Sequence, residues 1–136
     1  MIDTSHQSAA HLPMALVMDP KPLSVGLTDH LTRFYRVVHC SSLPLTLQTL
    51  AVEQPTLFVV SSRFAPTKLI QVLEALKERT TQSLIPVIIN LDLDQPSITL
   101  PGTRWAGKLG FITSDTSQNE FAALIERLFA THSSKC

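Results

Sequence analysis

Five short, mainly apolar runs recur along the chain, and each ends at polar or turn-forming residues. These runs predict strands, and they cover residues 15–18, 35–40, 56–60, 86–91 and 108–113. Continuous apolar runs of this length are typical of strands that a parallel sheet buries on both faces. The pattern therefore indicates five buried strands rather than an amphipathic antiparallel sheet.

Segments with an apolar residue every three or four positions separate the runs and predict helices. In the first, Pro22 suits the first helical turn. Its apolar positions recur at helical spacing, which predicts a buried face made of Leu23, Leu27, Leu31 and Phe34. The first helix is therefore expected to begin near Pro22 and to pack through Phe34.

Three further helices are predicted in the same way. A helix near 44–53 is expected to follow Ser41 and Ser42 as candidate caps and to bury Leu47, Leu50 and Ala51. Pro66 opens the next helix, whose apolar positions are Leu69, Val72, Leu73 and Leu76. The last begins at Ser117 with a capping-box sequence and is expected to bury Phe121, Leu124, Ile125 and Leu128.

Strands that alternate with helices predict a single α/β domain with right-handed crossovers and a doubly wound parallel sheet. We expect the domain at 14–131, a disordered leader at 1–13 and a frayed tail at 132–136. In such sheets, ligands gather outside the carboxyl ends of the strands. Candidate functional residues are therefore those at the strand exits.

Composition excludes some classes of partner. The formal net charge is +0 and 16% of residues are charged, so no broad positive field favours nucleic acid. No apolar stretch approaches the roughly 18 residues that a membrane span needs. The start of the chain lacks the basic residues of a signal peptide, which predicts a cytoplasmic protein. Cys40 and Cys136 have neither disulfide nor metal-site spacing.

The strand exits, taken in order, resemble the receiver domain of bacterial two-component response regulators. The segments that carry the resemblance are 16–23, 55–61, 85–88 and 111–114, and the similarity in pattern extends over about 14–130. It implies the flavodoxin-like strand order 2-1-3-4-5. It also implies a pocket at the strand exits where such domains hold two acidic residues, a phosphoacceptor aspartate, a Thr or Ser, and a lysine.

Most of those groups are replaced in this sequence. Asp19 matches one acidic residue, but Pro20 stands at the position of the second. Ser61 replaces the phosphoacceptor, Leu91 replaces the Thr or Ser, and Ser114 replaces the lysine. A serine hydroxyl is a weak nucleophile without an adjacent base. The resemblance therefore implies a degenerate receiver that works without aspartyl phosphorylation.

No metal or other cofactor is expected, because Mg²⁺ needs several oxygen ligands and Asp19 alone is a thin set. Asp92 and Asp94 follow the fourth strand and keep an alternative open. If they turned toward Asp19, the protein would be an atypical response regulator that is still phosphorylated or metal-bound. Their other interpretation is as solvated loop acids.

A protein partner is the expected means of action, and it would be a kinase, a transcriptional regulator or a second copy of this chain, as in a homodimer. Receivers commonly make contacts through their fourth helix, fifth strand and fifth helix. The segment 92–107 stands where that fourth helix would be, yet its prolines make it irregular. The candidate interaction face consists of Ile98, Leu100, Arg104, Trp105 and Phe111. Trp105 with Arg104 is typical of an interface anchor, although it would equally suit the cover of a sheet edge.

Two other functions are compatible with such a fold. A flavodoxin-like sheet can sense a small molecule at its rim, although the four glycines form no dinucleotide or phosphate-binding fingerprint. A serine hydrolase using Ser61 or Ser62 would need a glycine-flanked nucleophile turn, which the sequence lacks. His30 and His39 are predicted far from those serines. We therefore expect no enzymatic activity.

Overall fold

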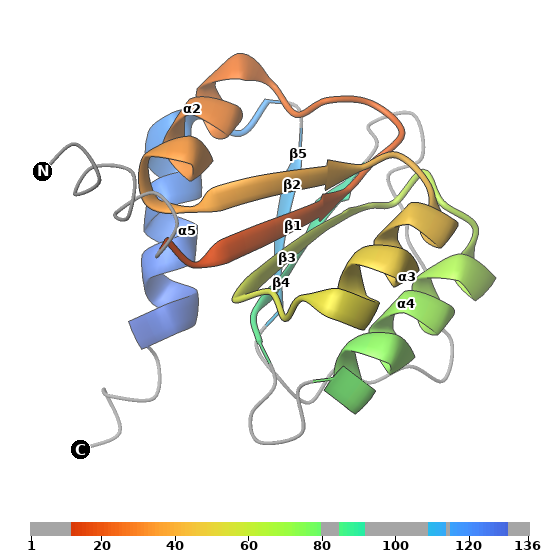
Figure 1. The fold of residues 1–136 in the computed structure, drawn as a ribbon. Helices are drawn as coiled ribbons and strands as arrows, with labels where there is room; N and C mark the ends of the chain where they lie inside the picture. The colour runs from red at the N-terminus through yellow and green to blue at the C-terminus, as the bar shows by residue number, and fades with distance from the viewer. Residues whose placement is uncertain (1–11, 80–84, 92–108, 114, 131–136) are drawn as a thin grey trace, which may run out of the picture.

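The chain alternates strands with helices along its length (Figure 1). The computed structural model describes residues 12–79, 85–91, 109–113 and 115–130. The strands are β1 (Met14–Met18), β2 (Arg36–Cys40), β3 (Leu57–Ser61), β4 (Val87–Leu91) and β5 (Leu109–Thr113). The helices in these ranges are α2 (Val25–Phe34), α3 (Leu43–Val52), α4 (Pro66–Arg79) and α5 (Gln118–Ala130).

All five strands form one parallel sheet with the order β2-β1-β3-β4-β5, which confirms the predicted fold class and strand order. The pairing places Ala15 beside Leu57 and Phe58 beside Val87. Every residue of β1 and β3 is buried, as their continuous apolar sequences predict. Because the strands are parallel, the ends of β1, β3, β4 and β5 meet at one edge of the sheet.

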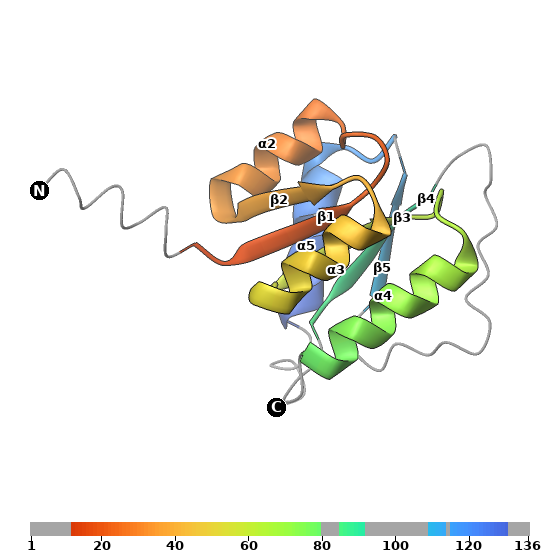
Figure 2. The ribbon, with the colours of Figure 1, turned by 45° about the vertical axis from the view of Figure 1, so that its right-hand side comes forward.

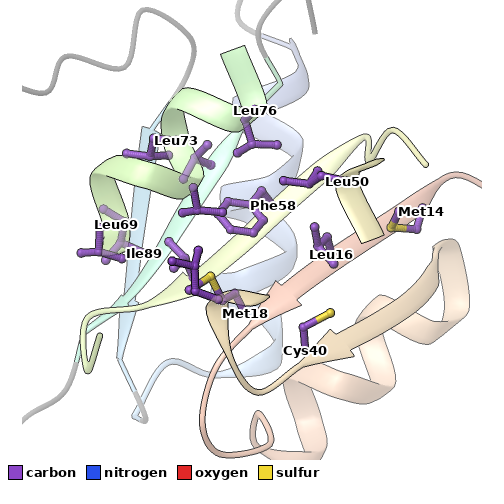
Figure 3. Close-up of a cluster of buried hydrophobic side chains, with 14 residues drawn as sticks. Met14, Leu16, Met18, Cys40, Leu50, Phe58, Leu69, Leu73, Leu76 and Ile89 are labelled. Carbon is purple, nitrogen blue, oxygen red and sulfur yellow. The ribbon is translucent and has the colours of Figure 1, made fainter. Parts of the chain in front are cut away.

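Helices cover both faces of the sheet, α2 and α5 on one and α3 and α4 on the other (Figures 1 and 2). Side chains of a strand alternate between faces. Leu16 and Phe58 accordingly join the core beneath α3 and α4, which Figure 3 draws, whereas Val17 and Val59 join the core beneath α2 and α5. The two cores hold the strand exits in fixed positions.

Several helix predictions are confirmed. The face of α4 that packs on the sheet consists of Leu69, Val72, Leu73 and Leu76. The buried positions of α5 are Phe121, Leu124, Ile125 and Leu128. The capping box is present, since the Ser117 amide donates to Glu120 Oε1 at 2.9 Å and the Glu120 amide donates to Ser117 Oγ at 3.1 Å.

The predicted start of the first helix and the predicted burial of Phe34 are wrong. Helix α2 begins at Val25, after Ser24 as N-cap, so Pro22 lies in the preceding turn rather than in the first helical turn. The Ser24 carbonyl accepts the first helical bond from the Thr28 amide at 3.0 Å. Phe34 is 55% exposed, because it ends the helix and its ring packs against His30 at 5.1 Å rather than on the sheet.

The buried face predicted for the second helix is also wrong in part. Leu50 is buried, but Leu47 is 37% exposed and Ala51 is exposed. The other buried positions of α3 are Leu43 and Thr46. The helix carries apolar residues on all of its sides, so their spacing does not select one buried face. Thr46 is accommodated because its hydroxyl donates to the Ser42 carbonyl at 2.8 Å.

Some predictions fall outside the described residues. These are the leader at 1–11, the tail at 132–136 and the irregular segment 92–107. Pro13, which the sequence analysis assigned to the leader, accepts a hydrogen bond from the Arg36 amide at 2.8 Å. Among the helices that the structure describes, none has both the length and the apolar character to cross a membrane.

Candidate functional site

The strand exits enclose a recess of about 160 Å³ at the carboxyl edge of the sheet. The residues contributing to its polar lining are Asp19, Lys21, Ser24, Arg63, Asn90 and Thr113. They come from the turn after β1, the start of α2, the loop after β3, and the ends of β4 and β5. The recess therefore lies where parallel α/β sheets hold their ligands.

Asp19 lies at the floor of this recess and is 3% exposed. Its backbone amide donates to the Cys40 carbonyl at 3.0 Å, which fixes the turn after β1 against the end of β2. Its carboxylate receives two hydrogen bonds, one from the Lys21 amide to Oδ1 at 2.9 Å and one from Asn90 Nδ2 to Oδ2 at 3.1 Å. Asp19 thus joins the exit of β1 to the end of β4 across the intervening strand β3.

Ser61, at the position that the resemblance gives to the phosphoacceptor, is 2% exposed. Its Oγ accepts a hydrogen bond from the Arg63 amide at 3.0 Å, which holds the turn between β3 and α4. In the described part of the chain, no histidine is hydrogen-bonded to this hydroxyl. Without an adjacent base, a serine is a poor nucleophile. The local geometry therefore gives Ser61 a structural role.

The other predicted pocket residues are placed differently or lie outside the described residues. Pro20 is exposed in the turn after β1. Leu91 is partly buried and packs against the core beneath α3 and α4. Ser114, Asp92 and Asp94 belong to the part of the chain that the structure does not describe. Of the predicted set, the structure brings Asp19 into the recess.

Sequence reasoning missed most of the polar residues of the recess, among them Lys21, Ser24, Arg63 and Asn90. Asn90 had a detectable signal, because it is the polar residue within the otherwise apolar strand β4. An amide at that position needs a hydrogen-bond partner when it is partly buried, and Asp19 supplies it. Lys21 and Arg63 gave no signal beyond their places one or two residues after a strand exit.

A second hollow, of about 380 Å³, lies over β5 and α5. Phe111 forms one wall and is 49% exposed, while Glu120 and Arg127 contribute charged groups to its lining. Leu109, two residues earlier on the same face of β5, is also exposed. The remaining residues of the predicted interaction face, namely Ile98, Leu100, Arg104 and Trp105, lie outside the described residues.

No protein-family model matches the chain, and no curated protein matches it. Several solved structures do match this chain. A response regulator receiver protein from Sinorhizobium medicae aligns with a TM-score of 0.60 at 16% identity, over 88% of this chain and 95% of that one. A response regulator receiver modulated diguanylate cyclase from Pelobacter carbinolicus aligns with a TM-score of 0.61 at 19% identity, over 91% and 97% of the two chains.

The signal receiver domain of a protein from Vibrio parahaemolyticus is also similar, with a TM-score of 0.61, 13% identity and coverage of 91% and 95%. The chain therefore has the fold of response regulator receiver domains, as its strand exits indicated. At these identities the likeness concerns the fold, so the chemistry has to be judged from the residues of this chain.

The receiver fold implies a Mg²⁺ ion at the strand exits, and the described residues do not fit one. Mg²⁺ is held through carboxylate and other oxygen ligands in octahedral geometry. Asp19 is the one carboxylate among the described residues that line the recess, and a single carboxylate falls short of the oxygen ligands that Mg²⁺ needs. The described residues contain no group of three His, Cys, Asp or Glu side chains arranged for a metal.

Proposed function

We propose that this protein is a receiver-like signalling module that acts by contact with another protein and does not depend on aspartyl phosphorylation. The observation that carries the proposal is Ser61, a buried hydroxyl at the end of β3, in a chain with the receiver fold. Acyl phosphate formation needs a carboxylate nucleophile at that position. We accordingly expect the chain to have no enzymatic activity of its own and to require no cofactor.

The hydrogen bonds at the recess support the same conclusion. The Ser61 hydroxyl is bonded to the Arg63 amide, and Asp19 is bonded to Asn90 and to the Lys21 amide. These bonds hold the strand exits together without phosphate. A switch that depends on phosphoryl transfer would need a reactive carboxylate and cationic stabilisation of the transferred charge.

The surface over β5 and α5 is the contact face that we propose. Exposed aromatic residues beside charged groups are typical of protein interfaces, where an apolar centre is surrounded by a polar rim. Phe111 supplies the aromatic group, and Glu120 and Arg127 supply the charges. Phe111 also begins the segment 111–114, and the resemblance to receivers implies an aromatic switch residue at that position.

The test is binding of a purified partner by the full chain and by two variants. The partner is first captured with the full chain from its native host and identified, and its affinity is then measured by calorimetry. Phe111→Ala is expected to weaken binding by about tenfold or more, as truncation of an aromatic anchor does. Phe34→Ala is the matched control, because Phe34 is a similarly exposed aromatic that lies on helix α2 rather than on strand β5.

Acetyl phosphate with Mg²⁺ should leave the affinity unchanged, and Ser61→Ala should bind as the unchanged chain does. Light scattering on the same samples tests whether the partner is a second copy. An affinity that rises with acetyl phosphate would contradict phosphorylation independence. Equal binding by Phe111→Ala and the unchanged chain would remove the β5–α5 surface from the proposal.

A further inference from the structure

The Asp19 carboxylate is deeply buried, and the hydrogen bonds it receives leave capacity unused. It is 3% exposed and accepts one bond on each oxygen, both from uncharged amides. An ionised carboxylate offers about four acceptor positions. Burying such a group is costly unless a cation or further donors compensate it. The open space beside it is the 160 Å³ recess.

Other groups that line the recess are cationic or carry partial positive charge. Lys21 contributes to its lining, and its side chain is exposed while its amide holds Asp19. The recess also borders Ser24, the N-cap of α2, whose side chain makes no capping bond. The first-turn amides of a helix carry partial positive charge and bind anions. A cation and a helix N-terminus therefore lie beside the same space as a buried carboxylate.

An apolar wall completes the recess, formed by Pro22, Leu23 and Leu27. At about 160 Å³, the volume is well below the roughly 300–1,000 Å³ of pockets for drug-sized ligands. The occupant must therefore be small, with a short aliphatic body between two groups of opposite charge.

We propose that this recess binds a small zwitterion of the amino-acid class. Its ammonium group donates to Asp19, and its carboxylate lies against Lys21 and the N-terminus of α2. A single ammonium is satisfied by one carboxylate and a few neutral acceptors, whereas a divalent metal is not. The inference goes beyond the proposed contact with a protein, because the recess and the β5–α5 surface are separate and each can fail alone.

The experiment is an amide chemical-shift titration of the full chain with glycine, L-alanine and β-alanine. Concentrations extend to about 10 mM, because ligands of this size commonly bind in the millimolar range. Acetate and methylammonium, each carrying half of the charge pattern, are titrated separately, and so is MgCl₂. At least one zwitterion is expected to shift the amides of Lys21, Ser24 and Asn90 in a saturable way, and each half-ligand to bind more weakly.

Two variants with matched controls assign the charges. Asp19→Asn removes the buried charge but keeps an acceptor oxygen, and it should weaken zwitterion binding about tenfold to a hundredfold, the range of a charged hydrogen bond. Asp29→Asn, an exposed acid on α2, should not. Lys21→Ala removes the cationic side chain from an exposed position, so the variant should still fold. Arg33→Ala, at the far end of α2, is its control.

Saturable binding that depends on Asp19 and Lys21 supports the proposal. Absence of shifts at the recess with all three zwitterions overturns it. Acetate or methylammonium binding as tightly as the zwitterions overturns the two-ended pattern. Saturable shifts around Asp19 with MgCl₂ and none with the zwitterions would show a metal site instead.

Discussion

Removing the Asp19 side chain gives the most informative test of how the strand exits are held together. The Asp19→Ala substitution leaves the Lys21 amide and the Asn90 side chain without their acceptor. Hydrogen bonds to a charged group are each worth about 1.5–3 kcal/mol, and part of that is offset because a buried charge is also removed. We therefore expect the free energy of unfolding to fall by about 2 kcal/mol.

The assay is urea unfolding at neutral pH in the absence of divalent ions, followed by circular dichroism. The midpoint should fall and the slope should stay constant, because the surface exposed on unfolding is unchanged. Asn90→Ala measured alone and together with Asp19→Ala gives the coupling energy, which we expect to be about 1 kcal/mol. Asp29→Ala is the control for removal of an exposed acid, with an effect within about 0.5 kcal/mol.

The sign of the effect separates two accounts of the recess. If Asp92 or Asp94 lay beside Asp19, the neighbouring carboxylates would repel each other, and removing Asp19 would leave stability unchanged or raise it. A stabilising Asp19→Ala, or a coupling near zero with Asn90→Ala, would therefore refute the hydrogen-bonded arrangement and restore the alternative of a metal-binding acid cluster.

Three further predictions concern the faces that hold the site in place. Gly110→Ala would set a Cβ 2.9 Å from Leu124 Cδ1 and should lower the free energy of unfolding, measured by thermal unfolding, by about 1–3 kcal/mol. Gly26→Ala has room for the added Cβ and should be neutral or stabilising. Equal effects of the two substitutions would contradict the packing of α5 on β5. Burial lowers the pKa of His30 below 6.5, and Arg33 adds to the effect. The neutral imidazole therefore contributes its whole stabilisation above pH 6.5, and the free energy of unfolding should decrease as the pH falls from there through the folded-state pKa. His30→Phe should flatten that dependence in urea titrations, and an unaltered profile would exclude His30. Ser117→Ala should lose about 1 kcal/mol by removing the α5 cap, and no change would mean that the capping box is unimportant.

The sheet could be predicted from the sequence because its central strands are mainly apolar runs between clear breaks, whereas the edge strands β2 and β5 carry polar residues and are partly exposed. A mainly apolar run of this length has to be buried on both faces, and in a small α/β domain the interior of the sheet provides that burial. The buried face of α3 could not be predicted, since leucines surround that helix and Thr46 satisfies its hydroxyl within the helix. The start of α2 was missed because Pro22 suits a helical turn as well as the turn that Asp19 organises.

The site was predictable in its location and less so in its composition. Strand exits of a parallel sheet converge, and the structure places Asp19 in the lining of the recess at that edge. Its partner Asn90 lies 71 residues away, and nothing local in the sequence of β4 says which carboxylate its amide meets. Lys21 likewise gave no local signal, because its contribution depends on how the turn after β1 folds back against α2.

The central claim is that the strand exits of this receiver-fold protein do not carry a metal-assisted phosphoryl group. The direct measurement is the amide spectrum of the full chain with Mg²⁺ and beryllium fluoride, a mimic of the phosphoryl group, together with the intact mass after incubation with acetyl phosphate and Mg²⁺. We expect no saturable shift at Asp19, Ser61 or Asn90 and no added phosphoryl mass. A Mg²⁺-dependent shift at those residues, or one phosphoryl group per chain, would contradict the claim.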